Sequence, residues 1–107
     1  DLARWSEPHM VLTLPETPPM PNSGFTESPF VFEREGYFYL SVSAYPIAWD
    51  ATMVFRSLAP YAFPSVPFTR LRAHAAEWLT SKDGRRLFMT HAGPGQRGVW
   101  LAPVDGL

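Results

Sequence analysis

Short runs rich in hydrophobic residues, separated by turn residues, make up most of the sequence. They lie at 28–33, 37–43, 51–57, 68–72, 76–81, 86–90 and 99–102, with a shorter one at 11–14. Runs of about four to eight residues with alternating hydrophobic and polar positions predict half-buried strands. Residues 34–36 (Arg-Glu-Gly) and 82–84 (Lys-Asp-Gly) fit hairpin turns in which glycine supplies a positive φ. The pattern predicts an all-β protein with antiparallel strands.

A repeat of 48 residues underlies this pattern. SPFVFEREG (28–36) aligns without gaps on AEWLTSKDG (76–84), and two further apolar strands follow each segment. Units of about 40–50 residues with several short strands are typical of β-propeller blades. The sequence therefore predicts one partial propeller domain: residues 1–24 end a preceding blade and form a connector, 25–72 are the first blade, and 73–107 are the second. Two blades cannot close a ring, because propellers typically have at least about four.

The composition narrows the class of protein further. The chain has 107 residues, enough for one domain, and its 12 prolines lie between the apolar runs, which favours strands and turns. The net charge of −1 offers no basic patch for nucleic acid, and no apolar run approaches the ~20 residues of a membrane helix. We therefore expect that the protein binds neither nucleic acid nor a membrane. The absence of cysteine leaves the compartment open, either cytoplasmic or secreted.

The segment ESPFVFEREGYFYLSVS (27–43) resembles the acid motif of the five-bladed β-propeller glycoside hydrolases. These are the arabinofuranosidase and xylosidase group (family 43) and the invertase group (family 32). In both, a Glu followed by a small residue and Pro opens the inner strand of a blade, and a Gly turn and an aromatic strand follow. The segments 74–103 and 5–12 resemble the following and the preceding blade. The resemblance covers nearly the whole chain and implies part of a five-bladed propeller.

The resemblance implies that Glu27 is the general acid that protonates the leaving glycosidic oxygen. The hydrolysis needs a second carboxylate, and the two Asp residues of the family match no residue here; we expect them upstream of Asp1, in a longer reading frame or a processed precursor. His74 lies at the inner start of the second blade, where a family 43 His can join a central cation. Because Ala-Ala-Glu follows His74, we expect no metal or cofactor, with calcium near His74 as the alternative. By position alone, Glu27 also fits an ordinary polar residue at a strand start.

Three other residues are candidates for binding the sugar. Tyr45 and Trp49 lie in the predicted loop after the second strand, where aromatic rings would form a stacking platform. His91 ends a strand at the Gly-rich segment GPGQRG and either lines a cleft or makes a structural hydrogen bond. The spacing of His9, His74 and His91 is not that of a metal site.

Glu77 falls within an apolar strand and allows two interpretations. It either lines the site with His74 or forms an ion pair with Arg70 or Arg72. The aromatic residues of the strands are predicted to form the core between blades; they are Tyr37, Phe38, Tyr39, Phe55, Trp78, Phe88 and Trp100.

Two functions from different classes follow. The first is that of a glycoside hydrolase fragment that acts on carbohydrate and is incomplete without the missing propeller portion. The second is that of a non-catalytic carbohydrate-binding or oligomerising module, whose copies associate through exposed strand edges. The sugar, the linkage and the stereochemical outcome depend on residues that the sequence does not contain.

Overall fold

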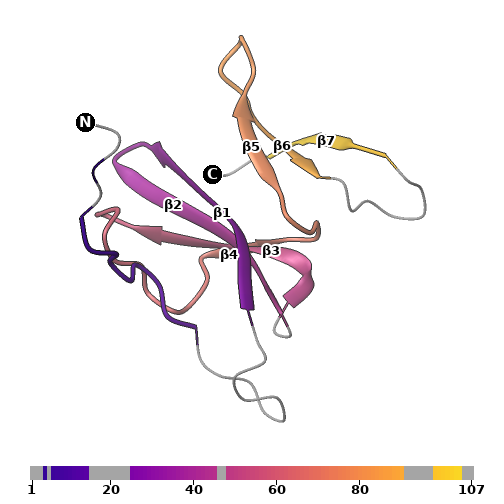
Figure 1. Cartoon of the computed structure of the whole chain (residues 1–107). Helices are drawn as coiled ribbons and strands as arrows, with labels where there is room; N and C mark the ends of the chain where they lie inside the picture. Colours follow the sequence, from indigo (N-terminus) through magenta and orange to yellow (C-terminus); the bar gives the residue numbers. More distant parts are fainter. Residues whose placement is uncertain (1–3, 5, 15–24, 46–47, 91–97, 105–107) are drawn as a thin grey trace.

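The chain folds into two antiparallel β-sheets, as the hydrophobic pattern predicts. The computed structural model describes residues 4, 6–14, 25–45, 48–90 and 98–104. The first sheet contains, in spatial order, β1 (Phe25–Arg34), β2 (Tyr37–Tyr45), β3 (Ala48–Ser57) and β4 (Thr69–Leu71), and the second contains β5 (Glu77–Thr80), β6 (Arg86–Thr90) and β7 (Trp100–Pro103) (Figure 1). No helix occurs in the described residues. The all-β prediction is confirmed.

The first hairpin has a turn of two residues. Arg34 pairs with Tyr37, so Glu35 and Gly36 form the turn, with φ values of 52° and 79°. Positive φ at both central residues is typical of a type I′ turn, whose twist matches that of the flanking strands. The predicted turn is therefore confirmed, and Gly36 supplies one of its two left-handed positions.

The second hairpin has a turn that is one residue longer. The Ser81 N–H donates to the Arg85 carbonyl at 2.9 Å, which leaves residues 82–84 as the loop, with Gly84 at a φ of 84°. The Ser81 hydroxyl donates a hydrogen bond to Asp83 and is the largest cause of the lowered pKa of that exposed carboxyl.

This difference in length corrects the ungapped repeat. Counted from the turns, the pair Val31–Leu40 of the first sheet is equivalent to the pair Trp78–Phe88 of the second. β1 therefore matches β5 with an offset of 47 residues (from 31 to 78), whereas β2 matches β6 with an offset of 48 (from 40 to 88). Side chains alternate between the two faces along a strand. The one-residue difference therefore places each residue of β5 on the face opposite to the one that the ungapped alignment with β1 implies.

The corrected register defines two equivalent faces on each sheet. Face A carries Phe32 and Tyr39 in the first sheet and the pair Leu79–Leu87 in the second. Face B carries the pair Val31–Leu40 in the first sheet and the pair Trp78–Phe88 in the second. Residues directly opposite each other on paired strands share a face, so the assignment extends along every strand.

The first hydrophobic core covers face B of the first sheet. Its buried members are Leu40, Val42, Ala44, Ala51, Met53, Phe55 and Phe63. Val11, Leu12 and Leu14 pack against them, and the Phe63 N–H donates to the Val11 carbonyl at 2.7 Å. The predicted strand at 11–14 is wrong, because this segment covers the sheet with side chains and does not pair as a strand.

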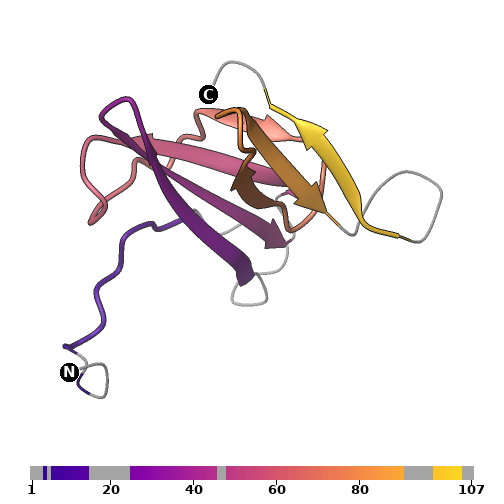
Figure 2. The same ribbon diagram turned by 90° about the horizontal axis from the view of Figure 1, so that it is seen from above.

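The second hydrophobic core joins the two sheets. Face A of the first sheet packs on face B of the second through Phe32, Tyr39, Val54 and Trp78, all of them buried. Figure 2 shows the backbones of the two neighbouring sheets. The Phe32 ring lies 5.1 Å from that of Tyr39 and 4.9 Å from that of Trp78. The Trp78 indole N–H donates to the Ser41 hydroxyl at 2.8 Å, so its polar atom is satisfied in the core.

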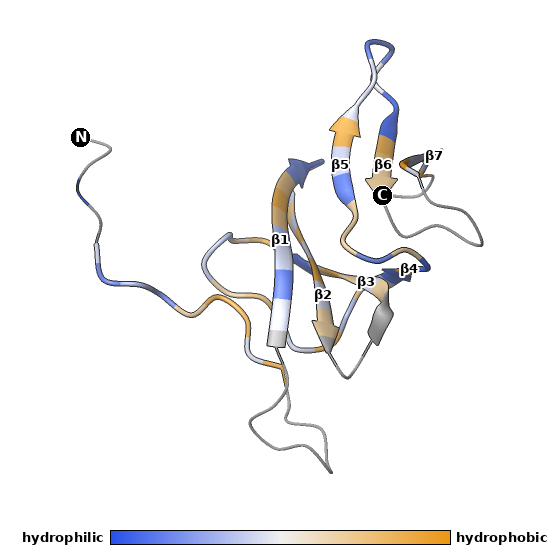
Figure 3. Ribbon diagram, turned by 45° about the vertical axis from the view of Figure 1, so that its right-hand side comes forward, coloured by the Kyte–Doolittle hydropathy of each residue, from blue (hydrophilic) through white to orange (hydrophobic). Residues whose placement is uncertain are grey.

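Six of the seven aromatic residues predicted to form the core divide between the two cores, and Trp100 belongs to neither. Tyr37, Tyr39, Trp78 and Phe88 lie between the sheets, as predicted. Phe38 and Phe55 belong to the first core, where they face the chain's own N-terminal segment and not a second sheet. Hydrophobic residues run through the strands of both sheets (Figure 3), so alternation identifies buried positions without identifying what covers them.

Replacing Trp78 by Ala is expected to lower the free energy of unfolding by about 3–5 kcal/mol, because the change leaves a cavity between the sheets. Urea unfolding monitored by circular dichroism measures it. As a control, Tyr61→Ala at an exposed position should change stability by at most about 0.5 kcal/mol. Equal effects of the two substitutions would show that the sheets are not held together by this contact.

Candidate functional site

A β-bulge sets the direction of the Glu27 side chain. Glu27 pairs with Ser43 and Phe30 pairs with Ser41, so the two residues between them oppose a single residue of β2. Ser28 within the bulge has a φ of 54°. Without the extra residue Glu27 and Phe30 would point to opposite faces; with it, both lie on face A, toward the second sheet.

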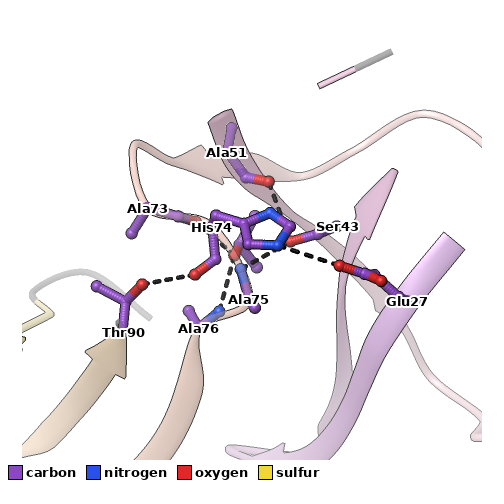
Figure 4. Close-up of polar contacts among 9 residues, drawn as sticks. Glu27, Ser43, Ala51, Ala73, His74, Ala75, Ala76 and Thr90 are labelled. Atoms are coloured by element: carbon purple, nitrogen blue, oxygen red, sulfur yellow. Dashed lines mark hydrogen bonds and ion pairs between the residues drawn. The ribbon is translucent and has the colours of Figure 1, made fainter. Parts of the chain in front are cut away.

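His74 meets Glu27 from the segment that leads into β5. The Nε2 atom of His74 lies 3.1 Å from Oε1 of Glu27, and the two side chains point toward one another in Figure 4. The His74 side chain is 12% exposed, whereas that of Glu27 is 40% exposed. The pair therefore has one end held inside the protein and one end open to solvent. The structure thus brings together two residues that sequence reasoning selected separately.

Three buried or partly buried hydroxyl groups hold the backbone around His74. The Thr52 hydroxyl donates to the Ala73 carbonyl at 2.6 Å and accepts from the Ala76 N–H at 3.1 Å. The Thr90 hydroxyl donates to the His74 carbonyl at 2.5 Å. Backbone groups that would be costly to bury unpaired are satisfied in this way by side chains of β3 and β6.

The third hydroxyl connects the same segment to β2 and β3. The Ser43 hydroxyl accepts from the Ala75 N–H at 2.9 Å and donates to the Ala51 carbonyl at 3.2 Å (Figure 4). Ala75 has a φ of 51°, a left-handed conformation that costs energy for a residue with a Cβ. We infer that the hydroxyl groups maintain this conformation and with it the position of His74.

The pair has the components of a proton-transfer site. A carboxyl group and an imidazole within hydrogen-bond distance can hold one proton between them and pass it to a bound group. The exposed part of Glu27 is where such a group would approach.

Glu77 lies on the opposite side of the second sheet from the inter-sheet core. It pairs with Met89 on face A, and both line a pocket of about 220 Å³ together with Ala75, Thr90 and Val99. Within the described residues no ion pair joins Glu77 to Arg70 or Arg72, so that interpretation is wrong. Glu77 thus lines a pocket beside the His74 segment, whereas His74 itself contacts Glu27.

Tyr45 and Trp49 are in strands, which corrects their placement in a loop. Tyr45 is the last residue of β2 and Trp49 the second of β3, because Ala44 still pairs with Ala48. Their side-chain positions and the whole of His91 lie outside the described residues. Their proposed contacts with sugar stay predictions.

The residues that sequence reasoning missed are Ser43, Thr52 and Thr90. A polar residue in an apolar strand is a weak signal for a buried hydroxyl, and the partners of these hydroxyls lie 8 to 32 residues away in sequence. The described residues contain no group of three or more His, Asp and Glu side chains arranged to hold a metal ion.

No protein-family model matches the chain, and comparisons with curated proteins and with solved structures find no match. In the described part of the chain, no helix is long and apolar enough to cross a lipid bilayer. The geometry of the site and the resemblance of its motifs are therefore what indicate a function.

Replacing Thr52 by Val should lower the free energy of unfolding by about 1–3 kcal/mol, because it leaves the Ala73 carbonyl and the Ala76 N–H without their partner. The His74 imidazole resonances should shift as well, since its backbone support is lost. Denaturant unfolding and NMR spectroscopy check both effects. Thr80→Val, at an exposed strand position, is the matched control and should do neither.

At Ser28, replacement by Val should be more destabilising than replacement by Gly by about 1–2 kcal/mol, because the left-handed conformation penalises a Cβ, and a branched one most. Thermal or urea unfolding of the two variants tests this. Equal stability would mean that Ser28 does not keep its positive φ in solution.

Proposed function

We propose that this chain is part of a β-propeller carbohydrate-active protein of the glycoside hydrolase type, with Glu27 in the position of the general acid. The observation that carries the proposal is the 3.1 Å contact between Glu27 and His74 at one end of the two sheets. A general acid must be positioned to pass its proton to the reacting group, and the contact with His74 would orient the Glu27 carboxyl for this role. The ESP motif and the aromatic strand after the turn support the same assignment.

The packing of the sheets supports the propeller part of the proposal. Neighbouring blades of a propeller meet through non-equivalent faces, so that each blade repeats the contact of the one before. Here face A of the first sheet packs on face B of the second, which is the head-to-tail relation that a propeller requires. A symmetric sandwich of two equivalent faces would have argued against it.

Glycoside hydrolysis needs a second carboxylate beside the general acid. The Asp residues of the resembled families match no residue here, and Glu77 lies on the far face of the second sheet, opposite Met89. We therefore expect binding of carbohydrate without turnover. A non-catalytic binding module gives the same result with the isolated chain, and differs in not depending on Glu27.

The proposal predicts that arabinan, xylan or fructan oligosaccharides shift the amide resonances around Glu27 and His74 in NMR titrations. Glu27→Gln should weaken this binding about tenfold or more, because the carboxyl–imidazole pair is lost, in line with the 1.4 kcal/mol of a modest polar contact. The matched control is Glu33→Gln, an exposed position on the same strand.

Three results would change the conclusion. Absence of binding to all of these sugars contradicts a carbohydrate function. Binding that is indifferent to Glu27→Gln favours the non-catalytic module. Turnover of aryl arabinofuranosides, aryl xylosides or sucrose that Glu27→Gln abolishes would contradict incompleteness and show that the site assembles, for example by association of several copies.

A further inference from the structure

Face A of the second sheet is largely hydrophobic apart from Glu77, and no other strand among the described residues packs on it. It presents aliphatic side chains from all three strands: Leu79, Leu87, Met89, Leu101 and Pro103. Leu101 is 58% exposed and Met89 36%, and Val99 beside them is 71% exposed. Face B of this sheet already packs on the first sheet through Trp78 and Phe88, so a second apolar face indicates a further contact.

The repeat identifies what fits this surface. In the first sheet, the equivalent face A is the one that packs on face B of the next sheet, through Phe32 and Tyr39. Leu79 and Leu87 occupy the positions of these two residues in the corrected register. The uncovered surface is therefore the continuation of an interface that already exists within the chain, with aliphatic side chains in place of aromatic ones.

A second copy of the chain does not offer the complementary face. Face B of the first sheet is covered by Val11, Leu12, Leu14 and Phe63 of its own chain. Beneath them Leu40, Met53 and Phe55 are each 3% exposed or less, so the cover would have to leave before another sheet could approach. Face B of the second sheet is occupied as well, by the first sheet.

We propose that face A of the second sheet binds a third antiparallel β-sheet of the same repeat, one whose face B presents a Trp–Phe pair equivalent to Trp78–Phe88. The third sheet would also close the pocket lined by Ala75, Glu77 and Met89 from its open side. This inference depends on the repeat and its register. It rests on the propeller part of the proposed function and involves neither Glu27 nor sugar, so its failure and a failure of carbohydrate binding are distinguishable.

The test extends the full chain with a third sheet. A second copy of residues 73–107 that carries Met89→Leu is appended after Leu107, so that the original Met89 is distinguishable, and the reactivity of Met89 with hydrogen peroxide is followed by mass spectrometry. We expect Met89 to be protected several-fold in the extended chain, while Met10, 75% exposed in the native chain, stays equally reactive as an internal control. The melting temperature should rise.

Two variants separate specific docking from simple attachment. Trp78→Asp in the appended copy alone should return Met89 to its native reactivity. Leu101→Asp in the original sheet should leave the melting temperature of the native chain unchanged, because Leu101 is exposed there, and lower that of the extended chain. Met89 equally reactive in the native and extended chains, or an appended sheet that stays unfolded, overturns the proposal. A native chain that is dimeric in solution with Met89 already protected overturns it in favour of a second copy.

Discussion

The placement of Trp78 between the sheets is the contact on which the rest of the structure depends. Its ring packs on Phe32, its indole N–H is satisfied by Ser41, and it pairs with Phe88 across β5 and β6. The first two contacts hold the second sheet on the first, and the third belongs to the register within the second sheet. Since the segment 73–76 leads directly into β5, the position of Trp78 also places His74 near the start of β1.

The site adds local polar structure to this apolar framework. The bulge at Ser28 turns Glu27 to the side of the second sheet, and the hydroxyls of Ser43, Thr52 and Thr90 hold the backbone that carries His74. The bulge and the hydroxyl contacts both have an energetic cost. The left-handed residues Ser28 and Ala75 are conformationally unfavourable, and the buried polar groups lose their contact with water. Their presence at one place, where a carboxyl and an imidazole meet, is typical of functional sites and not of a surface selected for stability alone.

Local sequence rules predicted the strands and the turns of this protein because they act over a few residues. Arg86–Thr90 was predicted with its observed bounds, and Gly36 and Gly84 both have the positive φ expected of their turns. It was harder to predict which face of the sheet each residue of β5 occupies. The second turn has one more residue than the first, so the ungapped sequence alignment places the residues of β5 on the wrong face. What covers a face depends on the distant residues 11–14, and nothing in the alternation of β2 and β3 indicates that segment.

The same limit applies to the site. Glu27 and His74 were selected from separate motifs, and their contact depends on the bulge, since Glu27 would otherwise point to face B. The sequence SPF at 28–30 contains no glycine to mark a left-handed residue, so the bulge has no strong local signal. Because the pair lies at the ends of the strands and the inter-sheet contacts lie on their faces, changes at Glu27 leave the apolar core intact. The proposed chemistry at this pair and the proposed binding of a third sheet can therefore be tested separately.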